Sequence, residues 1–94
     1  MIRHIVCWKF KEGENTAQNL EKIRRELCAL VGKIEGLESL EVGFCFSDGW
    51  DAALCSTLRD KAALEHYRTH PEHVKVADFI HTILEERTAA DYEM

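Results

Sequence analysis

The chain has 94 residues, which is enough for one small domain and too few for two. Hydrophobic residues make up 46% of the sequence and charged residues 31%, a mixture that is typical of a folded globular domain and unlike that of a disordered or fibrous chain. Twelve Lys and Arg against 17 Asp and Glu give a formal net charge of −5, which disfavours nucleic acid and anionic lipid as partners. We therefore expect a single folded domain over residues 1–94.

The apolar residues and the cysteines indicate the cellular compartment. No stretch reaches the roughly 20 apolar residues of a membrane span, and charged residues interrupt the N-terminal segment, so we expect neither a membrane span nor a signal peptide. The four cysteines lie far apart, without the paired spacing of zinc or redox motifs. They are Cys7, Cys28, Cys45 and Cys55. We expect a cytoplasmic protein with reduced thiols, no bound metal and no cofactor.

The first two predicted elements are a strand and a long helix. Residues 1–10 alternate in polarity with a period of two, which predicts a strand. The side chains that share its apolar face are Ile2, His4, Val6, Trp8 and Phe10. Asn15, followed three positions later by Gln18, resembles a capping box at a helix start. Apolar residues then recur at steps of three and four as far as Ile34, and Gly36 stands where a helix commonly ends.

A hairpin and a broken helical region follow. Residues 40–46 and 52–58 both alternate in polarity and are separated by a turn-forming segment, which predicts an antiparallel hairpin. Asp60 is placed to cap a helix that Pro71 interrupts, because proline disfavours helical geometry in the preceding residue and suits the first turn of a new helix. The apolar spacing of a helix continues beyond it, and residues 87–93 are expected to form a last, weakly patterned strand.

The order of these elements is β-α-β-β-α-β, which predicts an α+β, ferredoxin-like domain with helices covering one face of a four-stranded antiparallel sheet. The large apolar side chains belong to the helix-covered face. The opposite face is too apolar to remain in water, since it carries Ile5, Cys7, Gly43, Cys45, Ala53, Cys55 and Thr57, with charges only at its margins. Covering it with a second copy stabilises the assembly by about 25 cal/mol per Å² of buried apolar area. We expect a homodimer joined sheet to sheet.

Polar groups that could perform chemistry gather around the helix break. The segment from Tyr67 to His73 contains a phenol and two imidazoles, those of His70 and His73. A histidine in the first turn of a helix is biased toward its neutral form and can act as a base near pH 7, which favours His73 as a proton acceptor. His4 points from the first strand toward the same layer. We interpret His70 mainly as a residue that closes the helix break and secondarily as a ligand contact. Trp8 and Phe44 are interpreted as core aromatics or pocket lining.

Three parts of the sequence resemble the stress-responsive A/B barrel (Dabb) family over essentially the whole chain. They are the opening run Ile2-x-His4-Ile5-Val6-x-Trp8-Lys9-Phe10, the segment Tyr67-x-x-His70-Pro71-x-His73 with Phe79 after it, and the closing Asp91-Tyr92. The resemblance implies a dimeric α+β barrel. It also implies a site, because a polyketide cyclase of this family performs an aldol condensation with a tyrosine and a histidine at the positions of Tyr67 and His73. Its strand-one histidine matches His4.

Three functions remain open at this point. The first is a homodimer of unassigned activity that binds a small, partly apolar molecule in a pocket between sheet and helices. The second is a cofactor-free cyclase or lyase, in which His73 takes a proton from a carbon beside a carbonyl, Tyr67 donates to the carbonyl oxygen and Asp91 orients His73. The third is a purely structural stress protein whose pocket is filled by its own side chains. An open cavity that reaches Tyr67 and His73 would disfavour the third.

The substrate of the related cyclase is not carried over to this chain. Two polar pocket residues of that enzyme fall near Ala52 and Leu27, which have no hydrogen-bonding side chains. Polar contacts often dominate discrimination between substrates, so their loss would change what the pocket recognises.

Overall fold

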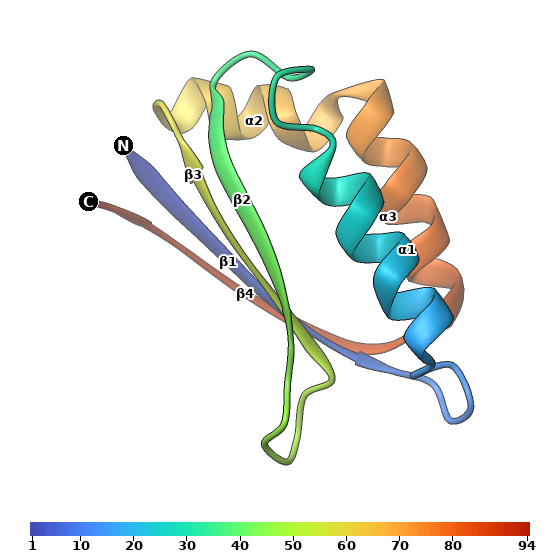
Figure 1. Ribbon diagram of the computed structural model, residues 1–94. Coiled ribbons are helices and arrows are strands. Elements are labelled where there is room, and N and C mark those ends of the chain that lie inside the picture. Colours follow the sequence, from blue (N-terminus) through green and yellow to red (C-terminus); the bar gives the residue numbers. More distant parts are fainter.

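The computed structural model describes residues 1–94 as four strands and three helices. In chain order they are β1 (Ile2–Phe10), α1 (Ala17–Cys28), β2 (Leu37–Phe44), β3 (Ala52–Leu58), α2 (Lys61–Thr69), α3 (Pro71–Ile83) and β4 (Leu84–Glu93). The strands form one sheet in the order β2-β3-β1-β4, and every neighbouring pair is antiparallel. The predicted ferredoxin-like fold is confirmed, with its second helix divided into α2 and α3. Figure 1 shows all three helices on one face of the sheet and nothing on the other.

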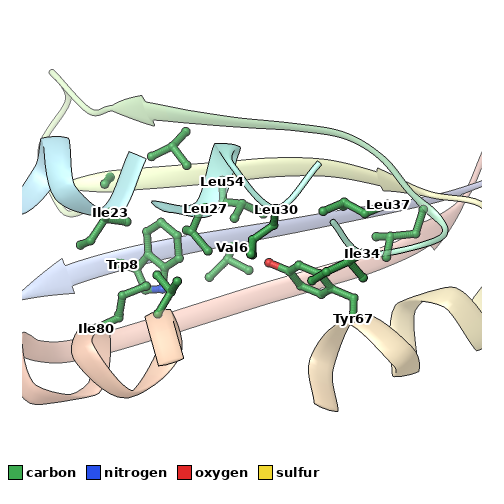
Figure 2. Close-up of a cluster of buried hydrophobic side chains, with 14 of the residues drawn as sticks. Val6, Trp8, Ile23, Leu27, Leu30, Ile34, Leu37, Leu54, Tyr67 and Ile80 are labelled. Carbon is green, nitrogen blue, oxygen red and sulfur yellow. The ribbon is translucent and has the colours of Figure 1, made fainter. Parts of the chain in front are cut away.

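The core lies between the sheet and the helices. Every even-numbered residue of β1 is buried and every odd-numbered one is only partly buried, so the predicted division between its two faces is correct. Nineteen buried hydrophobic residues form one continuous cluster in this layer. Figure 2 shows Trp8 of β1 in the layer between Ile23 of α1 and Ile80 of α3. The sheet therefore supplies one wall of the interior, and α1, α2 and α3 together supply the other.

The start of α1 differs from the prediction by one residue. Thr16, not Asn15, caps the helix, because its hydroxyl accepts a hydrogen bond from the Asn19 N–H at 3.1 Å. The Asn15 side chain instead donates to Asp51 at 3.0 Å, at the start of the hairpin's second half. Asn15 therefore fastens the loop before α1 to the sheet.

The end of α1 differs more. The helix ends at Cys28, and turns continue to Gly36 while keeping Leu30 and Ile34 buried. The apolar spacing of a helix continues past Cys28 because these turns direct their apolar side chains to the core, as the helix does. Gly36 has a φ of +90°, and a Cβ placed there would lie 2.6 Å from the Cβ of Ala63. Only glycine fits this close approach of the turn to α2.

His70 separates α2 from α3, as the proline that follows it predicted. The Asp60 carboxylate caps α2 by accepting from the Ala63 N–H at 2.8 Å. His70 has an extended backbone, its N–H donates to the Tyr67 carbonyl at 3.3 Å, and its Nδ1 accepts from the Glu72 N–H at 3.1 Å. One histidine thus ends the first helix and caps the second, and this bend turns the start of α3 back toward Tyr67.

The uncovered face of the sheet is made largely of small and apolar side chains. Ile5, Cys7, Cys45, Ala53 and Cys55 are all half-buried in the single chain. All four cysteines are unpaired thiols.

The longest helix, α3, has 13 residues, and no helix has both the length and the apolar character that crossing a membrane would require.

Two expectations about the strands need correction. β4 begins at Leu84, three residues before the predicted Arg87, because the chain passes from α3 into the strand without a loop. β2 ends at Phe44, so Phe46 leaves the sheet and is fully exposed. Phe44 is itself 46% exposed, because the last turns of the helical layer do not reach this end of the hairpin. It is therefore not a core aromatic in the single chain.

Candidate functional site

A cavity of about 390 Å³ opens between the sheet and the helices α2 and α3. Eight of its 14 lining residues are hydrophobic, so its wall is mostly apolar. The polar part comes from four elements and includes His4 on β1, Tyr67 on α2, His73 on α3 and Arg87 on β4. Trp8 also lines it. A volume of this size is at the lower end of small-molecule sites, and a mostly apolar wall with a few convergent polar groups is their usual composition.

Tyr67 lies at the centre of this arrangement. Its side chain is only 1% exposed, and Figure 2 shows its hydroxyl oxygen directed into the layer near Val6. No side-chain hydrogen bond of the chain includes the hydroxyl, which is not among the fully buried polar atoms without a partner and so keeps contact with the cavity. The ring lies tilted against His73 with the centroids 4.2 Å apart. Burial raises the pKa of Tyr67 far above its ordinary value, and the Arg87 charge opposes this only in part. The phenol is therefore neutral near pH 7 and can donate a hydrogen bond to an oxygen placed in the cavity.

His73 presents a free ring nitrogen. Its Nδ1 lies 3.2 Å from the Arg68 carbonyl oxygen, and because a carbonyl only accepts, this nitrogen carries the proton of the neutral ring. Burial lowers the pKa of His73, the Arg68 carbonyl raises it, and the nearby His4, Arg87 and His70 lower it further, with a net decrease. The imidazole is therefore neutral near pH 7, with the lone pair on Nε2 available to accept a proton.

Asp91 orients His4 and not His73, which corrects the sequence-based expectation. The antiparallel register places Asp91 of β4 directly opposite His4 of β1. One oxygen of the Asp91 carboxylate contacts His4 Nδ1, and the other accepts from Arg68 Nη2 at 2.8 Å. His73 Nδ1 is already occupied by the Arg68 carbonyl. Arg68, Asp91 and His4 thus form a chain that fixes the His4 ring, which is 4% exposed and meets Tyr67 edge-on at 6.1 Å between centroids.

The structure does not bring every expected residue to the cavity. Trp8 lines it, as predicted, and so does Leu27, one of the two apolar replacements. His70 and Phe44 do not, since His70 closes the helix break and Phe44 lies at the exposed end of β2. Ala52, the second replacement, is a fully buried residue of β3 outside the cavity lining.

Sequence reasoning missed four charged or titratable lining residues: Arg68, Asp78, His81 and Arg87. His81 is exposed and lies at the edge of the cavity. A signal for Arg87 did exist, because in a strand it shares a face with Asp91, four residues later. No three or more His, Cys, Asp or Glu side chains are grouped so as to hold a metal ion.

Comparisons with known proteins agree on a family. The stress-responsive A/B barrel domain (Dabb) profile matches residues 2–94. An uncharacterised protein of Streptomyces coelicolor is 35% identical over 81 residues, which cover 78% of this chain and 79% of that protein. The match to the family thus spans nearly the whole chain, including the segments that carry His4, Tyr67, His73 and Asp91.

Solved structures share the fold. An Arabidopsis thaliana protein superposes with a TM-score of 0.88 at 25% identity, covering 100% of this chain and 95% of that one. A dimeric ferredoxin-like protein of unknown function from Bacteroides fragilis gives 0.82 at 28% identity, with 99% and 95% covered. The hydroxynitrile lyase of Passiflora edulis gives 0.86 at 18% identity, with 99% and 92% covered, a likeness of fold alone. Because the family profile matches residues 2–94, the chain belongs to the stress-responsive A/B barrel domain family.

Proposed function

We propose that the protein is a homodimer that binds a small, partly apolar carbonyl compound in the cavity between sheet and helices. The observation that carries this proposal is the open cavity itself, of about 390 Å³, which reaches both Tyr67 and His73. A purely structural domain would fill this space with its own side chains, since protein interiors are normally packed to the density of organic crystals. The Tyr67 hydroxyl takes part in no hydrogen bond within the chain and borders the cavity, so it is a ready donor for a carbonyl oxygen.

The dimer is supported by the uncovered face of the sheet. A single layer of helices covers only one side, and the other side offers a continuous area of small and apolar residues. A chain of this size buries only about 60–70% of the surface that its unfolded form exposes, so a second copy adds substantially to its stability. The Bacteroides fragilis protein of the same fold is described as dimeric.

Binding is tested with acetophenone, a neutral aromatic ketone small enough for the cavity. Titration followed by NMR is expected to shift resonances of Tyr67 and His73. Ala77→Phe places a ring in the cavity wall and is expected to abolish the shifts. Ala17→Phe is the matched control, because Ala17 is exposed in the first turn of α1 and away from the cavity. Binding that survives Ala77→Phe, or that is absent from the unmodified protein for acetophenone and for larger ketones, would contradict the proposal.

The geometry also favours a second, catalytic function at the same site. His73 has a free Nε2 and a lowered pKa, while the raised pKa of Tyr67 keeps its phenol protonated. A ketone whose oxygen accepts from Tyr67 could lose an α-proton to His73, which leaves an enolate held by the phenol. Return of a solvent-derived proton from His73 to the same carbon completes an exchange that needs no cofactor.

This second function is measured as exchange of the acetophenone methyl protons for deuterium in D₂O. We expect His73→Ala to remove the protein-dependent exchange while leaving the oligomeric state and thermal midpoint nearly unchanged, because His73 is only half-buried. Tyr67→Phe should slow the exchange but keep the base in place. Equal exchange by the protein and by His73→Ala would exclude His73 as the base, without affecting the binding proposal.

A further inference from the structure

Arg87 is a cationic residue of the cavity wall that has no ionic partner. It lies on β4, where the register places it opposite Trp8 and therefore on the helix-facing side of the sheet. It is exposed to solvent and lines the cavity, and no carboxylate lies within ion-pairing distance of its guanidinium. The other arginine of the cavity, Arg68, is different, because its charge is balanced by Asp91 at 2.8 Å.

The charges that face the cavity do not balance Arg87 from another element. Asp78 on α3 is the only carboxylate among the lining residues, and no ion pair joins it to Arg87. The Asp91 carboxylate is occupied by His4 and Arg68. The guanidinium charge of Arg87 is therefore left unbalanced within the chain and remains accessible from the cavity and from solvent. An arginine in such a position matches an anionic group that the chain does not supply.

The position of Arg87 relative to the reactive groups is consistent with this. Arg87, Tyr67 and His73 all line the same cavity, and the Arg87 charge lowers the pKa of both Tyr67 and His73. A ligand that fills this cavity of about 390 Å³ borders both the Arg87 and the Tyr67 side chains. Arg87 is thus placed to orient a ligand whose carbonyl oxygen lies at Tyr67.

We propose that Arg87 binds a carboxylate of the ligand, so that the cavity accepts a small oxo acid whose carbonyl oxygen accepts from Tyr67 and whose remainder packs on the apolar wall. This inference rests on the proposed function and narrows its ligand class. A guanidinium presents two parallel N–H donors that match a carboxylate. One unpaired arginine also matches one negative charge, whereas a phosphate dianion would leave excess charge near Asp78.

The test compares benzoylformate, an aromatic oxo acid, with its uncharged methyl ester. A charge-assisted hydrogen-bonded pair contributes about 1.5–3 kcal/mol, which corresponds to roughly tenfold to a hundredfold in affinity. We expect benzoylformate to bind at least about tenfold more tightly than the ester by calorimetry, with an affinity that falls as salt is added. Arg87→Gln should remove the preference, measured as the ratio of the two affinities in that variant.

Two further variants separate Arg87 from general charge effects. Arg25→Gln removes an exposed arginine of α1 that has no ion pair and does not line the cavity, so it should retain the preference. Asp78→Asn should retain or strengthen it, because it removes a negative charge from the cavity wall.

The failure of this inference can be distinguished from failure of the binding proposal. Equal affinities for benzoylformate and its ester, or a preference that persists in Arg87→Gln, would overturn the role of Arg87 while leaving acetophenone binding intact. The same holds if acetophenone binds and neither of the two compounds does. Absence of binding for all three compounds would overturn both proposals.

Discussion

Tyr67→Phe removes one hydroxyl group and leaves the buried ring in place. The residue is 1% exposed, no side-chain hydrogen bond of the chain includes its hydroxyl, and the hydroxyl keeps contact with the cavity. Burying a hydroxyl without a partner costs about 1–3 kcal/mol on mutational scales, and contact with water in the cavity offsets part of this. We therefore expect Tyr67→Phe to raise the free energy of unfolding by up to about 1 kcal/mol. For a domain of this size, that corresponds to an increase in Tm of roughly 4–8 °C.

The measurement is thermal and urea unfolding followed by circular dichroism at one fixed protein concentration, because the stability of a dimer depends on concentration. Tyr67→Ala serves as the control at the same position, since deleting a buried aromatic ring typically costs about 3–5 kcal/mol. A gain in stability for Phe together with weaker acetophenone binding would show a group kept for function at the expense of the fold. A loss of more than about 1 kcal/mol in Tyr67→Phe would show that the hydroxyl is bonded inside the protein, and the argument for a free donor would fail.

The remaining predictions concern pH, packing and assembly. Because the pKa of His73 is lowered from its unfolded value of 6.5, the unfolded chain takes up a proton more readily than the folded chain, and the free energy of unfolding falls as the pH drops through 6.5. In urea unfolding measured as a function of pH, His73→Gln should show a shallower fall. Equal slopes for the two proteins would refute the lowered pKa. Gly36→Ala should lower the free energy of unfolding by about 1–3 kcal/mol, and by more than Gly32→Ala does. Both glycines have a positive φ, but only at Gly36 would an added Cβ meet a neighbouring Cβ. Equal losses in the two variants would mean that α2 moves aside. Cys7→Glu places a charge in the middle of the uncovered sheet face and should yield monomers or aggregates in sedimentation experiments, whereas an intact dimer would place the subunit contact elsewhere.

The fold could be predicted because its signals are local. The alternation in β1 and the proline after His70 each act within a few residues, and both features appear in the structure as expected. The end of α1 could not be found in this way, because turns after Cys28 keep Ile34 buried with the spacing of a helix. Apolar spacing reports which residues face the core and does not report whether the backbone between them is hydrogen-bonded as a helix.

The part of the site that depends on local sequence signals was predicted, and the part that depends on strand register was not. Tyr67 and His73 are close in sequence, so their proximity followed from one helix break. The partner of Asp91 depended on the register between β1 and β4, which a weakly patterned strand does not specify. The cavity-lining position of Arg87 was missed because it depends on the same register, although Arg87 lies on the same face of β4 as Asp91.

The contact between His4 and Asp91 joins positions 87 residues apart. Closing so long a loop is entropically unfavourable until the intervening elements have folded, so pairing of β1 with β4 is expected late in refolding. An intermediate that contains β1, α1, β2 and β3 would already bury much of the apolar layer. In it, the His4 imidazole would still lack its contact with Asp91. In a stopped-flow refolding experiment, the contact of the His4 ring with Asp91 is therefore expected to form last, after the fluorescence of Trp8 has reported collapse.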